Sequence, residues 1–138
     1  MTAVKLYNHE RFPYHIIEAI HAICEYISRD ARHAIVQVCA EGIAKEKEDP
    51  ESTLSSRWGI PKILALKLGV DERTTQRWFA KEIQGCNDNL FKLIELALEY
   101  SPAQTIRVIQ DDLEKYRNYF ISITTEFYSE VRQGGVGV

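Results

Sequence analysis

Apolar side chains recur at three- and four-residue intervals along most of the chain, which is the spacing of helices that bury one face. Residues 14–28 carry one such face and follow Pro13, which suits the first turn of a helix. Residues 31–46 carry a second face, and we expect Asp30 to cap that helix. No segment shows the period of two that is typical of strands. The pattern therefore predicts an all-α protein.

The polar stretch at 45–56, KEKEDPESTLSS, interrupts this pattern and predicts a loop. Beyond it, the apolar positions predict short helices at 61–68 and 72–81 and a further helix at 88–100. Ser101-Pro102 then starts a last helix that runs to about residue 131. The glycine-rich residues 132–138 are expected to form a flexible tail.

The last helix has the sharpest periodicity of the chain, because its large apolar residues follow one another at intervals of 3, 4, 3, 4, 3 and 4. These residues are Ile106, Ile109, Leu113, Tyr116, Phe120, Ile123 and Phe127. Such a heptad stripe with polar surroundings is typical of a helix that joins a second copy of the chain. The alternative is a long helix packed on its own domain. The large aromatic residues favour a bundle over a tight two-stranded zipper, with dimer and tetramer both open.

The net charge of −3 argues mildly against a nucleic-acid partner, but the charge is unevenly distributed along the chain. Residues 1–56 carry six basic and nine acidic residues, and residues 93–138 carry four and seven. Residues 57–92 carry seven basic and four acidic residues, which gives this segment a charge of +3. Phosphate binding needs a basic face rather than a basic protein, so 57–92 is the candidate segment.

The segment 61–82, PKILALKLGVDERTTQRWFAKE, has the features of a helix-turn-helix. This motif needs a small residue where two helices cross, a turn residue that accepts positive φ, and apolar residues that fix the angle between the helices. Ala65 is the small residue, Gly69 is the turn residue, and Val70 and Trp78 are among the apolar ones. Asp71 stands where an N-cap would accept the first amides of the second helix.

The second helix then leaves a polar set outside its buried edge. Arginine pairs with guanine through two hydrogen bonds, and glutamine pairs with adenine in the same way. The side chains that suit base edges are Glu72, Arg73, Gln76 and Arg77.

The run LALKLGVDERTTQRW resembles the helix-turn-helix of the Cro/repressor-like superfamily, especially that of lambdoid phage activators and repressors. The resemblance covers about 20 of the 138 residues. It implies that Glu72, Arg73, Gln76 and Arg77 face the bases and that Asp71 is the cap. It also makes Lys62, Lys67 and Lys81 candidates for phosphate contacts. We add Arg57, which lies just ahead of the motif, and Thr74, which lies in its second helix.

Two departures from the family's pattern stand out. Thr75 lies where the family usually has Ile or Val, so its hydroxyl has to bond to a backbone carbonyl, and we expect that of Asp71 or Glu72. The polar stretch of a dozen residues before the motif is also unusual, because the family's first helix follows more closely.

Other chemistries find little support. His21 and Cys24 are three residues apart, as metal ligands can be, but no second close pair completes a tetrahedral set. Paired carboxylates such as Asp111-Asp112 lie on expected solvated faces, and there is no glycine-rich phosphate loop. We therefore expect no metal, no cofactor and no enzymatic activity. The three cysteines, the lack of a signal peptide and the lack of a membrane span favour reduced thiols in the cytoplasm.

These patterns together predict a helical bundle over residues 1–100, with a helix-turn-helix at 61–81, and a separate oligomerisation helix at 101–131. The expected function is that of a sequence-specific transcriptional regulator of phage or mobile-element type. It would bind double-stranded DNA as a homodimer or homotetramer, with the second helix of the motif in the major groove. The alternative is a protein-binding adaptor, such as an anti-repressor or an inhibitor, that uses a bundle of similar shape.

Overall fold

The computed structural model describes residues 12–54, 57–80 and 87–133, which form six α-helices and no strand. In order, the helices are α1 (Tyr14–Cys24), α2 (Arg29–Glu48), α3 (Ile60–Leu68), α4 (Glu72–Phe79), α5 (Asn87–Tyr100) and α6 (Pro102–Gln133). The all-α class expected from the periodicity is confirmed. The expected tail belongs to α6 as far as Gln133, and residues 134–138 lie outside the described part.

The start of α2 differs from the expected one, because the helix begins two residues earlier and is capped by Ser28 rather than by Asp30. The Ser28 side-chain oxygen accepts a hydrogen bond from the Ala31 N–H at 3.2 Å. Asp30 lies inside the first turn, where its charge favours the positive end of the helix dipole. Ser28 also ties the bundle to α6, because its backbone N–H donates to Oδ2 of Asp112 at 2.9 Å.

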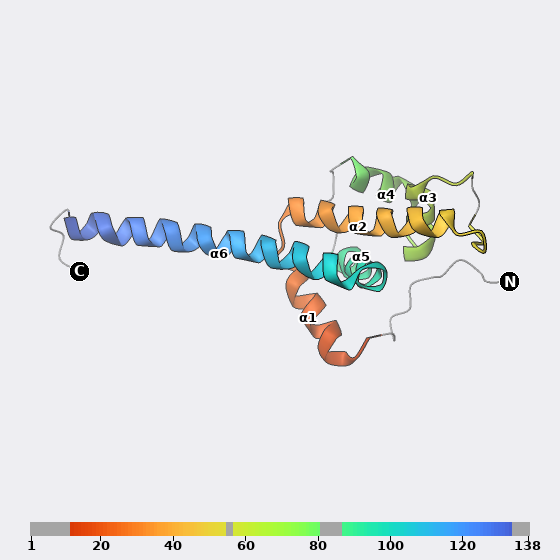
Figure 1. Ribbon diagram of the computed structural model, residues 1–138. Helices are drawn as coiled ribbons and strands as arrows, with labels where there is room; N and C mark the ends of the chain where they lie inside the picture. Colours follow the sequence, from red (N-terminus) through yellow and green to blue (C-terminus); the bar gives the residue numbers. More distant parts are fainter. Residues whose placement is uncertain (1–11, 55–56, 81–86, 134–138) are drawn as a thin grey trace.

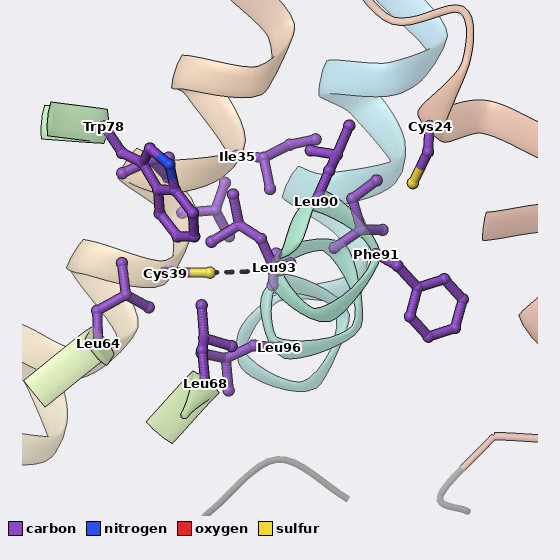
Figure 2. Packing of buried hydrophobic residues seen from close by; sticks show 14 of the residues in the cluster. Cys24, Ile35, Cys39, Leu64, Leu68, Trp78, Leu90, Phe91, Leu93 and Leu96 are labelled. Atoms are coloured by element: carbon purple, nitrogen blue, oxygen red, sulfur yellow. Dashed lines mark hydrogen bonds between the residues drawn. The ribbon is translucent and has the colours of Figure 1, made fainter. Parts of the chain in front are cut away.

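The core forms around α5, against which α1, α2, α3 and α6 pack (Figure 1). Leu93 and Ile94 at the centre of α5 are fully buried, and Ile35 and Cys39 of α2 face them. In Figure 2 the Cys39 thiol points at the backbone of α5, where it donates a hydrogen bond to the Leu93 carbonyl at 3.6 Å. Burial raises the pKa of the other core thiol, that of Cys24, to about 11. Both thiols are free.

Helix α6 has two parts with different surroundings. In its first turns Thr105 is fully buried, while Val108 and Ile109 pack against the core. Ile109 is partly buried, so this member of the stripe predicted to join subunits also contacts the core of its own chain. The helix then continues away from the bundle (Figure 1). We call residues 114–133 the projecting segment, which is about 30 Å long at 1.5 Å per residue.

Candidate nucleic-acid interface

A tight turn separates α3 from α4, so residues 61–79 are not one continuous helix. Gly69 ends α3 with φ 69° and ψ 34°, the left-handed conformation expected of the turn residue. The next backbone N–H, that of Val70, donates to the Ala65 carbonyl at 3.0 Å and closes the end of the helix. Ala65 itself is buried, as a small residue at a close helix contact should be.

Thr75 connects the two helices from inside. Its hydroxyl lies 2.9 Å from the Glu72 carbonyl, which confirms the bond expected from the sequence, and 2.7 Å from the Pro61 carbonyl at the start of α3. The side chain is fully buried. This β-branched residue with a hydroxyl therefore fills a buried position and adds a polar link between α3 and α4. The sequence indicated the local bond but not the link across the turn.

The N-cap of α4 differs in detail from the expected one. Asp71 occupies the N-cap position with an extended backbone, and its carbonyl accepts from the Thr74 N–H at 3.0 Å. Its carboxylate makes no capping hydrogen bond and is exposed. The expectation that the side chain caps the helix is therefore wrong. The carboxylate stays on the surface beside Glu72, at the positive end of the α4 dipole.

Helix α4 packs against α3 and α2 and leaves its other side open at the surface of the bundle (Figure 1). Thr75 and Trp78 supply its buried edge. In Figure 2 the Trp78 ring points from α4 into the core. The expected base-reading residues all lie on the exposed remainder, at positions i, i+1, i+4 and i+5 of one helix side. They are Glu72, Arg73, Gln76 and Arg77.

The residues that were expected to contact phosphates differ in how exposed they are. Arg57 and Lys62 are exposed, and Lys62 holds its ammonium 5.3 Å from the centre of the Trp58 ring. Thr74 is half-buried at the first turn of α4. Lys81 lies outside the described residues. Within 57–80, four exposed cations accompany two exposed carboxylates, so the exposed residues of this segment keep an excess of positive charge.

Lys67 is the exception, because only 1% of it is exposed. Its ammonium lies 3.0 Å from Oε2 of Glu46 on α2, and 5.8 Å from the centre of the Tyr100 ring. The Tyr100 hydroxyl donates to the same Glu46 oxygen at 3.2 Å, while the ring lies so close to α2 that a Cβ at Gly42 would collide with it. Burial and the negative charge of Glu46 raise the pKa of Tyr100. The predicted phosphate contact of Lys67 is therefore wrong.

This buried cluster of Lys67, Glu46 and Tyr100 holds α3 against α2 and against the end of α5. The sequence did contain a signal for it. Lys67 follows Ile63 by four residues and Leu64 by three, so it shares the helix side of two fully buried residues. A lysine on that side has to be paired when it is buried.

No three side chains of His, Cys, Asp or Glu come together in 12–54, 57–80 and 87–133 as a metal site would need. His21 instead stacks on the Phe91 ring, with ring centres 4.1 Å apart. Over the same part of the chain, none of the helices combines the length and the apolar character that a bilayer crossing requires.

Comparison with protein-family models, with curated proteins and with solved structures finds no match to the chain. The likeness to the Cro/repressor-like superfamily therefore rests on residues 61–82 and remains a prediction from them.

Proposed function

We propose that the chain is a sequence-specific DNA-binding regulator of transcription, of phage or mobile-element type, that acts as an oligomer. The observation that carries the proposal is the exposed side of α4. It presents two arginines, Arg73 and Arg77, with Gln76 between them, on a short helix anchored from behind by Thr75 and Trp78. The excess of positive charge among the exposed residues of 57–80 supports the same partner.

In this proposal α4 enters the major groove of double-stranded DNA. Arg73 and Arg77 each donate two hydrogen bonds to a guanine, and Gln76 pairs with an adenine. Glu72 accepts from a cytosine amino group, because a carboxylate is an acceptor only. Arg57 and Lys62, on the loop before α3 and on α3 itself, hold the DNA backbone and set the register of the helix.

The projecting segment of α6 joins subunits in the same proposal. Beyond the bundle, the predicted stripe continues with Tyr116, Phe120, Ile123 and Phe127, all of them exposed in the single chain. Pairing through these side chains removes them from water and brings together two copies of α4. Two half-sites about one helical turn, or a multiple of it, apart are then bound together, which raises the affinity through the effective concentration of the second site.

The test is a binding measurement in which the full chain is added to a fluorescent duplex pool of random sequence at several salt concentrations. We expect binding that weakens steeply with salt, together with enrichment of a short two-part sequence after repeated selection. Binding without any enriched sequence would remove the base-reading roles. Absence of binding at low salt would overturn the proposal as a whole.

A second candidate, a protein-binding adaptor, has one observation in its favour. The burial of Lys67 takes one cation away from the motif, on a chain whose total charge is already −3. An adaptor would use the acidic surfaces of the chain and would leave the duplex pool unbound at every salt concentration. The salt titration therefore separates the two candidates.

A further inference from the structure

The projecting segment carries a second apolar stripe beside the predicted one. Its members are Ile121, Thr124, Tyr128 and Val131, at intervals of 3, 4 and 3. The first three follow Phe120, Ile123 and Phe127 of the first stripe by one residue each. One residue turns an α-helix by about 100°, so the two stripes run side by side and face directions about 100° apart.

The second stripe has the chemistry of a packing surface. Tyr128 is 58% exposed and Ile121 is 43% exposed, which is large for side chains of this kind. The Thr124 hydroxyl donates within the helix, to the Phe120 carbonyl at 2.8 Å, so it needs no partner outside it. The rings of Phe127 and Tyr128 meet edge to face with centres 5.2 Å apart, and they connect the two stripes into one apolar arc.

Only the opposite side of the projecting segment is uniformly polar. That side carries Lys115, Asn118, Ser122, Thr125, Ser129 and Arg132. A pair of helices covers a single seam of each helix. A pair formed through the first stripe would therefore leave Ile121 and Tyr128 in water. The segment needs neighbours on two sides.

The size of the arc and its charge identify the neighbours as further copies of this chain. The exposed large apolar side chains of the segment amount to roughly 800 Å², more than the largest patch of an ordinary monomer and about what one partner contributes to a stable interface. The charges of the segment are balanced, with three basic residues against three acidic ones. Identical segments therefore do not repel one another, and both stripes have the heptad spacing through which helices interdigitate.

We infer that four copies of the chain associate through a four-helix bundle of projecting segments, in which each α6 uses its two stripes against two different neighbours. Four helices at the corners of a square face their neighbours at 90°, close to the angle between the stripes, whereas three helices would need 60°. The inference rests on the association through α6 that the proposed function includes. It adds the number of subunits in the assembly and the second contact surface of α6.

The test is the mass of the full chain in solution, measured by sedimentation equilibrium over a range of concentrations. The wild-type chain is expected to have the mass of four chains. The variant Ile121→Gln/Tyr128→Gln places a good helix former at both positions and removes the second stripe. The mass of this variant is expected to fall to that of two chains or less. The matched control Asn118→Gln/Ser129→Gln lies on the polar side and is expected to keep four chains. Tryptophan fluorescence verifies that the bundle stays folded in both variants, because Trp78 is buried there.

A wild-type mass of one, two or three chains at all concentrations would overturn the inference. It would be overturned equally by a second-stripe variant that keeps four chains. The result is independent of the DNA proposal, because a four-chain assembly that binds no duplex refutes the regulator and leaves the bundle intact.

Discussion

The bundle and the projecting segment of α6 treat their apolar side chains in opposite ways. In the bundle, residues such as Leu93 and Ile94 are fully buried among helices of the same chain. In the projecting segment, Tyr116 is 73% exposed, and the other aromatic residues of the segment are exposed as well. The core of the bundle therefore gains its hydrophobic stabilisation within one chain, whereas the large apolar side chains of the projecting segment remain in contact with water in the single chain. The effect of a mutation on stability or on association should therefore differ between these two regions.

The largest difference is expected from truncating one apolar side chain in each region. Leu93→Ala leaves a cavity at the centre of the bundle and should lower the free energy of unfolding by about 2–5 kcal/mol. Phe120→Ala should change it by less than about 0.5 kcal/mol at low protein concentration, where association adds little. Denaturant titration followed by tryptophan fluorescence measures both. Equal losses would mean that the projecting segment packs on the bundle.

The buried ion pair sharpens the comparison for charged residues. Glu46→Leu removes the carboxylate that balances Lys67 and should lower the free energy of unfolding by about 3 kcal/mol. The double variant Glu46→Leu/Lys67→Met should recover most of that loss, because an apolar pair fits the same space without a buried charge.

The control for this prediction is Glu126→Leu on the projecting segment, where the carboxylate is exposed and the stability of the bundle should not change. A full loss in the double variant would mean that Glu46 stabilises the bundle through another contact. Thermal unfolding of the three variants decides between these outcomes.

Arginines at the surface should affect binding and leave stability alone. Arg73→Ala should weaken binding to the selected duplex by about 1–3 kcal/mol and relax the base preference at one position of each half-site. Its free energy of unfolding should stay within about 0.5 kcal/mol of wild type. Arg132→Ala, an exposed arginine of the projecting segment, is the matched control and should keep the base preference. Unchanged affinity in Arg73→Ala would remove α4 from the DNA interface.

The smallest effect is expected at the turn between α3 and α4. Gly69→Ala forces a side chain into a left-handed conformation and should cost about 1 kcal/mol of unfolding free energy, although the site has open space around it. Gly59→Ala is the control, because its φ is −72° and any residue adopts that conformation. Calorimetric melting temperatures of the two variants compare them directly. A loss as large at Gly59 would show that the turn has no special requirement.

The sequence predicted the helices well because their signal is local. The three- and four-residue spacing placed α3 at 61–68 and α5 at 88–100, each within one residue of the structure. Two of the features that escaped prediction depend on partners far along the chain. Ser28 meets Asp112, and Lys67 meets Glu46, at separations of 84 and 21 residues. The Asp71 carboxylate was assigned a role by its position, but position alone does not decide where a side chain points.

For the candidate interface, the sequence was most informative where backbone geometry restricts the choice of residue. Gly69 and Thr75 could be placed because a left-handed turn and a buried hydroxyl each demand a specific solution. The phosphate contacts were harder to predict, because an exposed lysine and a buried, paired one have the same side chain. Lys62 and Lys67 lie on the same helix and differ only in the side they occupy.

One helix without interruption runs from the bundle into the projecting segment, and this gives α6 a fixed rotational phase. Asp112 anchors its early part to Ser28, so the direction of every later side chain relative to α4 is set by counting residues. One residue inserted after Leu113 would rotate both stripes by about 100° around the helix axis, while seven would return them almost to the same direction. Projecting segments whose lengths differ by whole heptads should therefore be interchangeable, and segments of other lengths should misalign the attached bundles.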